Sequence, residues 1–413
     1  MSYARVPMRL AAGLVGATVL LVTAPAQAQP AQQTPQPEQA REAPPPWTQG
    51  RPPDLEGSTL RPHPPGLVAK PASEIRLDKV KLPAGFRIEV WAADVANARS
   101  MARGSKGTIF VGTRFVGNVY AIVDRGGRRE VKVVAKGLHR PNGVAFKDGT
   151  LYVAELSRIL RFDHIEDRLD NPPDPVVVFD KLPRDEPHGW KFLSLGPDGW
   201  LYFNVGAPCN ICVPPYTHAQ IVRVDPNARI LQTYALGVRN SVGMDWHPRT
   251  RELWFTDNGR DWLGDNAPQD ELNHAPRAGL HFGYPYCHQG DVLDPELGAG
   301  RACAEFMPPV LKLGPHTAGL GMRFYTGSMF PAQYRNRIVV ALHGSWNRTK
   351  KTGFNVSTVS VDPRQPARAE VLADFLDGEE FLGRPADVLV MPDGALLVSD
   401  DVNGAVYRIS YRR

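Results

Sequence analysis

One pattern returns six times along this chain: a tight turn is followed by residues that alternate between apolar and polar side chains. Alternation with a period of two is typical of a β-strand, and little helical periodicity lies between the copies. A unit that recurs in this way indicates a radial β-repeat, because each unit buries its apolar side against its neighbours. The copies are SKGTIFVGT (105–113), KDGTLYVAE (147–155), GPDGWLYFNVG (196–206), HPRTRELWFTDNG (247–259), YRNRIVVALHG (334–344) and MPDGALLVSDD (391–401).

Residues 78–413 are therefore predicted to form one all-β domain, a six-bladed β-propeller built from half-buried strands. The 39 Pro and 38 Gly residues support many short elements joined by turns. The long interval between the fourth and fifth copies, about 251–337, predicts an insertion that carries Cys287 and Cys303. A β-sandwich with coincidental turns is the alternative.

The N-terminus has the features of an export signal. Arg5 and Arg9 precede the apolar run LAAGLVGATVLLVTA, and the AQA triplet at 26–28 supplies the small residues of a cleavage site. We expect residues 1–28 to be a signal peptide, removed on export to the periplasm, after which no transmembrane segment remains. An uncleaved anchor is the alternative, although the apolar run falls short of the ~20 residues that span a bilayer. Residues 29–77, which begin rich in Pro, Gln and Glu, are predicted to be a flexible leader.

Charge and cysteine content exclude some functions. A net charge of +5, with scattered Lys and Arg, gives no argument for nucleic acid as a partner. Four cysteines in an exported chain favour disulfides, and the spacing suggests Cys209 with Cys212 and Cys287 with Cys303. A four-cysteine zinc site is the alternative. A c-type haem would need His after the second Cys of CNIC, where Val213 stands, so that assignment fails.

Polar residues that a structural repeat does not need precede three of the repeated strands. They are His188 in PHGWKFLSLGPDG, Arg239 and Asn240 in ALGVRNSVGMDWHP, and Arg384 and Asp387 in FLGRPADVLVMPDG. Loops that lead into the innermost strands of a propeller surround its central channel, so we expect these side chains to converge on one mouth. A histidine, two arginines and an asparagine suit an anionic cofactor or substrate with a base beside it.

At these residues the sequence resembles the soluble quinoprotein sugar dehydrogenases, which include aldose and sorbosone dehydrogenases. The resemblance runs from LPAGFRIEVWA (82–92) to the C-terminus, and it is carried by HGWKFLSLGPDGWLYFNVG, GVRNSVGMDWHP, TDNGRDWLGDNAPQDELNHAPRAGLHFGYPYC, GLGMRFYTGSMFP, ALHGSWNRTKKTGF and GRPADVLVMPDGALLVSDD. It implies a six-bladed propeller that binds pyrroloquinoline quinone (PQQ) and calcium.

The resemblance also implies roles for single residues. His188 matches the general base that removes the proton of the sugar C1 hydroxyl while hydride passes to the quinone, a task that suits a neutral imidazole. Arg239 matches the arginine beside the reacting carbonyl, where a fixed cation stabilises developing negative charge. Asn240 would hydrogen-bond the cofactor, and its carboxylates would be held by Arg384 and by the HGSWNR segment with His343 and Arg348.

Calcium prefers oxygen ligands and readily uses backbone carbonyls. The stretch that the resemblance assigns to the ion is Asn258-Gly259-Arg260, with Gly259 and Arg260 as the implied metal positions. Asp270 and Glu271 in QDELN are acidic and close in sequence. They are interpreted either as solvated loop residues or as ligands of a second, structural calcium.

Some positions depart from the sugar dehydrogenase pattern. Acidic residues that often stand beside the catalytic histidine and after the following glycine are replaced by Pro187 and Ala207, and His343 stands where a lysine is usual. The GAPCNIC and HGSWNR forms are closer to the sorbosone dehydrogenase branch. The resemblance therefore predicts the cofactor and leaves the sugar open.

The sequence thus predicts a periplasmic PQQ-dependent oxidoreductase that oxidises C1 of an aldose or a sorbosone-like sugar aldehyde. Its electrons would pass to an external acceptor, a soluble cytochrome or membrane quinone, because the chain has no haem motif. One alternative is a metal-dependent propeller lactonase or hydrolase. The other is a non-catalytic secreted propeller that binds carbohydrate or a protein.

Overall fold

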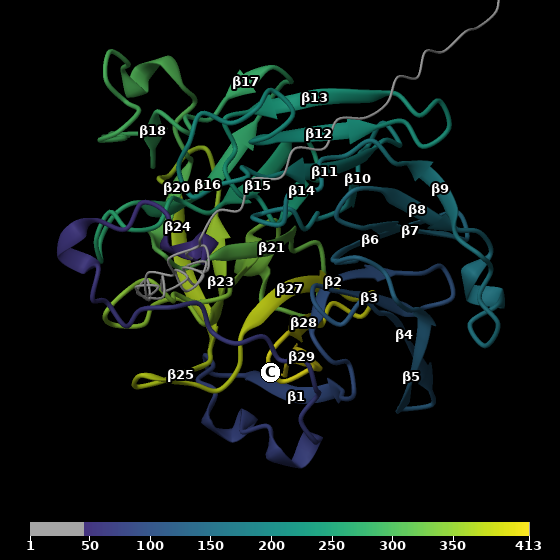
Figure 1. Ribbon diagram of the computed structural model, residues 1–413. Helices are drawn as coiled ribbons and strands as arrows, with labels where there is room; N and C mark the ends of the chain where they lie inside the picture. Colours follow the sequence, from purple (N-terminus) through teal and green to yellow (C-terminus); the bar gives the residue numbers. More distant parts are fainter. Residues whose placement is uncertain (1–44, 413) are drawn as a thin grey trace, which may run out of the picture. The chain divides into compact units, whose positions relative to one another are not determined.

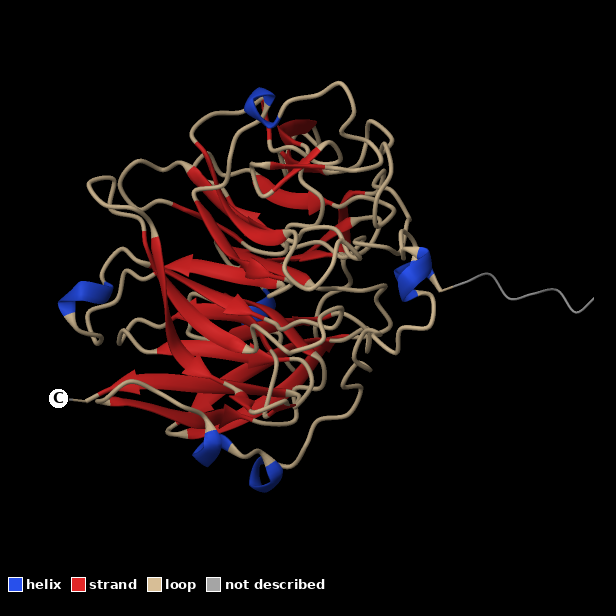
Figure 2. Cartoon of the chain, turned by 90° about the vertical axis from the view of Figure 1, so that its left-hand side faces the viewer, coloured by secondary structure: helices blue, strands red, loops and turns tan. Residues whose placement is uncertain are grey.

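The computed structural model describes residues 45–412. The predicted signal peptide, 1–28, and residues 29–44 of the predicted leader lie outside the described residues. The described chain is built from short strands and 3₁₀ turns. Six sheets of four or five strands follow one another around a central axis, and two further sheets have two strands each (Figures 1 and 2). The predicted all-β, six-bladed β-propeller is confirmed.

The first three sheets follow the chain in order, and each is an antiparallel meander that starts at the centre. Blade one contains β2 (Ala98–Arg103), β3 (Ile109–Thr113), β4 (Val119–Arg125) and β5 (Arg128–Ala135); blade two contains β6 (Gly143–Lys147), β7 (Thr150–Ala154), β8 (Ile159–Phe162) and β9 (Val176–Phe179); blade three contains β10 (Ser194–Leu195), β11 (Leu201–Val205), β12 (Gln220–Val224) and β13 (Leu231–Leu236).

The last three sheets complete the ring, and the sixth joins the two ends of the domain. Its outer strand is β1 (Phe86–Ala92), which pairs antiparallel with the C-terminal β29. Blade four contains β14 (Met244–Trp246), β15 (Leu253–Asp257), β16 (Gln269–Ala275) and β20 (Leu311–Pro315); blade five contains β21 (Gly319–Phe324), β22 (Ile338–Leu342), β23 (Asn355–Ser360) and β24 (Arg368–Asp374); blade six contains β27 (Pro385–Val390), β28 (Leu396–Asp400), β29 (Ala405–Tyr411) and β1.

All six repeated motifs form the second strand of a blade, but these strands are more buried than the alternation predicts. Every residue of β3, β11, β15, β22 and β28 is buried. The reason is that each sheet packs between two others, so both of its faces meet a core. Phe110 of β3, for example, shares one apolar cluster with Val144 of β6 and Val153 of β7 in the next blade.

The predicted insertion lies within blade four, between its third strand β16 and its fourth strand β20. It contains β17 (Leu280–His281), which extends blade three by parallel pairing with β13, and a hairpin of β18 (Cys287–His288) and β19 (Val292–Leu293). Both predicted disulfides are confirmed, Cys209 with Cys212 and Cys287 with Cys303. The remaining short pair is β25 (Leu376–Asp377) with β26 (Glu380–Phe381).

Residues 45–77, which fall within the predicted leader, run along the propeller before β1. They contain the short 3₁₀ turns Pro46–Thr48, Pro53–Leu55 and Ala72–Glu74, and a fourth begins at Leu77 (Leu77–Lys79). His63 Nε2 lies 3.0 Å from the Ser345 carbonyl, and the Lys70 amide donates to the Asn403 carbonyl. Further 3₁₀ turns are Ile165–Asp167, Cys303–Glu305 and Ala332–Tyr334. Within residues 45–412, no helix is long and apolar enough to cross a membrane.

Candidate functional site

A cavity of about 650 Å³ opens at one end of the propeller axis. Two kinds of position line it, because loops at this end either enter the innermost strand of a blade or leave its second strand. His188 precedes β10, Asn240 precedes β14 and Arg384 precedes β27; Arg114 follows β3, Asn258 follows β15 and His343 follows β22. The expected convergence of the sequence candidates on one mouth is therefore present for most of them.

His188 is held in one orientation and one tautomer. Its Nδ1 lies 2.9 Å from the Ala207 carbonyl oxygen, and a carbonyl can only accept, so Nδ1 carries the proton. The Nε2 atom is then the free base. Burial, with the nearby cations Arg239 and Arg114, lowers the pKa of His188 well below 6.5, which keeps the imidazole neutral. His188 also adopts a positive φ of 48°, a costly conformation for this residue type that clusters at functional sites.

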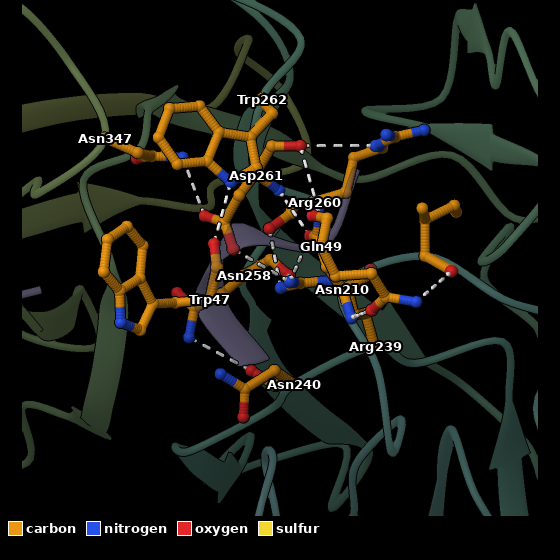
Figure 3. Close-up of polar contacts among 12 residues, drawn as sticks. Trp47, Gln49, Asn210, Arg239, Asn240, Asn258, Arg260, Asp261, Trp262 and Asn347 are labelled. Atoms are coloured by element: carbon orange, nitrogen blue, oxygen red, sulfur yellow. Dashed lines mark hydrogen bonds and ion pairs between the residues drawn. The ribbon is translucent and has the colours of Figure 1, made fainter. Parts of the chain in front are cut away.

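Arg239 is fixed by five acceptor contacts rather than projecting freely. Its guanidinium donates to the carbonyls of Asn210 (2.9 Å), Asn258 (3.1 Å) and Gly259 (2.7 Å), and to the side chains of Asn210 and Asp261. Figure 3 shows these contacts around Asn210. Burial raises the pKa of the Asp261 carboxyl and Arg239 opposes that rise. The guanidinium is thus a preorganised cation at the cavity wall.

Asn210 stands in the small ring closed by the Cys209–Cys212 disulfide and contacts three separate segments. Its Oδ1 accepts from Arg239 Nη2 and from the Asp261 amide (2.7 Å), and its Nδ2 donates to the Gln49 carbonyl (2.8 Å). Gln49 Oε1 in turn accepts from the Asn210 amide. The ring therefore presents one asparagine that joins the N-terminal segment to Arg239.

A second cationic group lies across the cavity. Arg384 donates to the carbonyls of His343 and Gly344, both at 3.1 Å, and its pKa is lowered by burial to about 10, so it is charged at neutral pH. His343 Nε2 lies 2.8 Å from Asp401, which also pairs with Arg99 at 3.0 Å. Burial, with Arg384 nearby, lowers the pKa of His343 to about 3, so this imidazole is neutral.

Several polar atoms of the wall are left without partners. Within residues 45–412, the Oδ1 atoms of Asn240 and Asn258, the Nε1 of Trp190 and the Nε of Arg114 are buried and lack a hydrogen bond. Native structures satisfy nearly all such groups. The unpartnered donors of Trp190 and Arg114 suit an anionic ligand group, whereas the Oδ1 acceptors of Asn240 and Asn258 suit a donor or a cation.

Three candidates differ in placement from the others. Arg348 is not among the residues that line the cavity; its guanidinium donates to the carbonyls of Asp265 and Lys350. Arg260 is fully buried and pairs with Asp294 and Glu296. Asp387, within β27, pairs with Arg323 below the mouth.

The interpretation of Asp270 and Glu271 as solvated loop residues is wrong, because both are buried on β16. Asp270 accepts from the Gly259 and Ala318 amides. Burial raises the pKa of Glu271 to about 8, and the neighbouring Asp257 carboxyl adds to that rise. Among the described residues, no cluster of three or more His, Cys, Asp or Glu side chains is placed to hold a metal ion.

The sequence reasoning missed Arg114, Trp190, Asn210 and Trp47, all of which line the cavity. Arg114 had a readable signal, since it directly follows a repeated strand, as Asn258 and His343 do. Trp47 had none, because its contact with the cavity depends on how residues 45–77 cross the propeller.

Comparison with known proteins places this geometry in context. The profile of the family described as Glucose / Sorbosone dehydrogenase matches residues 166–408, more than half of the chain. An uncharacterized protein of Borreliella burgdorferi is 31% identical over 360 residues, which cover 83% of this chain and 93% of that protein. The matched stretch contains His188, Arg239, His343 and Arg384, and begins after Arg114.

Solved structures share the fold. The holo form of a pyranose dehydrogenase PQQ domain from Coprinopsis cinerea is 20% identical, with a TM-score of 0.68, over 80% of this chain and 97% of that one. The PQQ-bound aldose sugar dehydrogenase of Streptomyces coelicolor is 18% identical, with a TM-score of 0.59, over 80% and 100%. The apo aldose sugar dehydrogenase of Escherichia coli is 19% identical, with a TM-score of 0.62, over 79% and 100%.

Proposed function

The chain belongs to the glucose/sorbosone dehydrogenase family, and on that premise we propose that it is a PQQ-dependent oxidoreductase acting at C1 of an aldose or a sorbosone-like sugar aldehyde. The observation that carries the proposal is the arrangement of His188. A neutral imidazole, oriented by the Ala207 carbonyl, faces a cavity lined by cations and by unpartnered polar atoms.

The charged and polar lining of the cavity supports a planar, multiply carboxylated cofactor as its ligand. Arg384 is a charged donor at the wall, and its fork geometry suits a carboxylate. The unpartnered Oδ1 atoms of Asn240 and Asn258 can each accept a hydrogen bond or coordinate a cation. We assign Arg384, His343, Asn240 and Arg239 to cofactor binding, and we leave Arg348 out because its guanidinium is committed outside the cavity.

PQQ, when bound, supplies a two-electron acceptor for the hydride of the sugar C1. The chain's own part is to move a proton and to stabilise charge. His188 Nε2 accepts the proton of the C1 hydroxyl, and its Nδ1–H stays bonded to Ala207, which keeps the ring aligned. Arg239 is held by carbonyls and Asp261, so its positive charge needs no reorganisation as the reaction proceeds.

We propose that backbone carbonyl oxygens of Asn258–Arg260 coordinate calcium, since calcium prefers oxygen ligands of this kind. The Gly259 carbonyl accepts a hydrogen bond from Arg239 at 2.7 Å, so a bound ion and this guanidinium would share one oxygen. If calcium takes this place, chelation with EDTA will weaken PQQ affinity; unchanged affinity would leave Arg239 as the only cation there.

We propose a periplasmic location with a soluble cytochrome or membrane quinone as electron acceptor. Two closed disulfides support an oxidising compartment.

The experiment is a titration of the purified protein with PQQ in calcium, with dye reduction followed across a panel of aldoses and sorbosone. His188→Ala serves in parallel. We expect PQQ to restore sugar-dependent dye reduction and the variant to lose turnover while it still binds PQQ. Absence of PQQ binding would overturn the proposal. Lactone hydrolysis without quinone would favour the alternative of a propeller lactonase or hydrolase. Saccharide binding without turnover would favour the alternative of a non-catalytic binding propeller.

A further inference from the structure

Arg114 differs from the other arginines of the cavity because its guanidinium has neither an ion pair nor a hydrogen bond within residues 45–412. Arg384 also lacks an ion pair there, but it donates to the carbonyls of His343 and Gly344. Arg99 pairs with Asp401, Arg140 with Glu186 and Arg239 with Asp261. The guanidinium of Arg114 makes no hydrogen bond or ion pair with residues 45–412, and its buried Nε is unpartnered. The guanidinium instead lies over two aromatic rings: its Cζ atom is 3.4 Å from the centroid of the Trp190 ring and 4.6 Å from that of the Phe115 ring.

Stacking leaves the donor edge of this guanidinium unused. A ring face attracts the cation but accepts none of its in-plane N–H groups. Burial, with Arg99 and Arg140 nearby, lowers the pKa of Arg114 well below 12.5, and the charge of Asp401 opposes this shift only in part. A cation held in this way costs free energy until an anion joins it.

A second unpartnered donor lies beside the first. Trp190 is 9% exposed, lines the cavity, and its Nε1 has no hydrogen bond to the described residues. The Trp190 ring is also 6.1 Å from the His188 ring, centroid to centroid. Arg114 and Trp190 therefore stand next to the proposed base, where the reacting sugar has to lie.

The acids near this position are already in use. Glu186 is bonded to His139 and Arg140, and Asp401 to Arg99 and His343. Neither of them forms an ion pair with Arg114 within residues 45–412, and the charge of Asp401 offsets that of Arg114 only in part. The cavity therefore has two separate cationic groups: Arg114 on blade one and Arg384 on blade six.

We propose that Arg114, with Trp190, forms a carboxylate subsite for the substrate, so that the sugar oxidised at C1 is a sugar acid such as a uronate. The planar fork of arginine matches a carboxylate in two parallel hydrogen bonds. The assignment rests on the proposed function and adds the substrate class to it.

The test compares D-galacturonate with D-galactose, which differ in the oxidation of C6, in wild type, Arg114→Gln and Arg114→Lys. We expect wild type to favour galacturonate in kcat/KM by about tenfold or more, the size of one charge-assisted contact. Arg114→Gln will remove that preference by raising KM for galacturonate, and it will leave kcat/KM for galactose within about threefold of the wild-type value. Arg114→Lys, which keeps the charge, will recover part of it.

Arg129→Gln is the matched control, because Arg129 also stacks on a tryptophan, Trp91 at 4.7 Å, but lines a different cavity and pairs with Asp124. It should leave both substrates unchanged. Equal wild-type rates on the two sugars, or an equal loss on both in Arg114→Gln, would overturn the subsite. Loss of PQQ affinity in Arg114→Gln would mean that Arg114 binds a carboxylate of the cofactor, which would overturn the substrate assignment.

A separate readout keeps this inference distinct from the proposed function. Calorimetry on the protein without PQQ measures galacturonate binding whether or not any sugar is oxidised. Binding that Arg114→Gln abolishes supports the subsite even if dehydrogenase activity is absent. Lack of galacturonate binding in active wild-type enzyme would overturn the carboxylate subsite at Arg114 and would not affect the proposed function.

Discussion

The Nδ1 atom of His188 lies 2.9 Å from the carbonyl oxygen of Ala207, and this single bond decides which nitrogen of the ring is available to a substrate. Ala207 follows Gly206, where an added Cβ would lie 2.6 Å from the Cβ of His188. The close approach of two loops at this glycine therefore sets the position of the proposed base.

The pH dependence of turnover follows from that bond. The base works only when neutral, so kcat/KM falls as pH falls through its pKa, which burial and two cations hold well below 6.5. We expect activity to persist below pH 6.5, and Arg114→Gln, which removes one of these cations, to move the acid limb upward. A pH profile of kcat/KM checks both; a limb at or above 6.5 in wild type would contradict the role of His188.

Arg384 and Arg348 provide a matched pair of substitutions. Arg384→Gln should weaken PQQ binding about tenfold or more, because it removes a charged donor at the cavity. Arg348→Gln should change it less than about threefold, since that guanidinium is bonded to the Asp265 and Lys350 carbonyls. Fluorescence titration with PQQ measures both, and equal losses would show that the cavity is wider in solution than the structure has it.

Asn210→Ala should lower kcat more than it lowers PQQ affinity. The substitution removes the Oδ1 acceptor of Arg239 and the Nδ2 donor to Gln49, so the guanidinium loses one of its fixed contacts. Stability should fall by about 1–3 kcal/mol, since buried partners are left unsatisfied. Asn227→Ala, at an exposed turn, is the control. Turnover that matches the control would remove Asn210 from the positioning of Arg239.

Glu271→Gln should stabilise the protein at alkaline pH. Burial raises the pKa of Glu271 to about 8, so the folded chain keeps a proton that the unfolded chain loses above about pH 4.3. Stability is therefore lost as pH rises between these values, by about 1.4 kcal/mol per pH unit for one proton. The amide mimics the protonated acid and removes that slope.

Urea unfolding of the Glu271→Gln variant at pH 6 and pH 8 measures the effect, with Glu56→Gln at an exposed position as the control. The same pH dependence in wild type and Glu271→Gln would mean that Glu271 is ionised in the folded protein.

Much of the architecture was open to prediction because it depends on local pattern. The six strand motifs, the insertion and both disulfides follow from alternation, spacing and cysteine position, and each is present. The depth of burial was underestimated. Alternation reports one apolar face, whereas each blade packs between two others and buries both.

Several site residues were also readable, because a propeller carries equivalent loops to one end of its axis. His188, Asn240 and Arg384 line the cavity as the repeat predicts. Arg348 does not, although Trp346 and Asn347 of the same loop do, since its guanidinium donates to the Asp265 carbonyl instead. Sequence distance alone does not fix which way a side chain in such a loop points.

The sequence by itself determined the number of blades and several of the positions that face the mouth, since these depend on periodicity and residue type. Only the tertiary structure decided which charges find partners. Arg239 donates to the carbonyls of Asn210, Asn258 and Gly259, while within residues 45–412 the guanidinium of Arg114 contacts the rings of Trp190 and Phe115 and has no hydrogen bond. Those outcomes rest on contacts between segments far apart in the chain, and electrostatic compensation exists only once the segments meet.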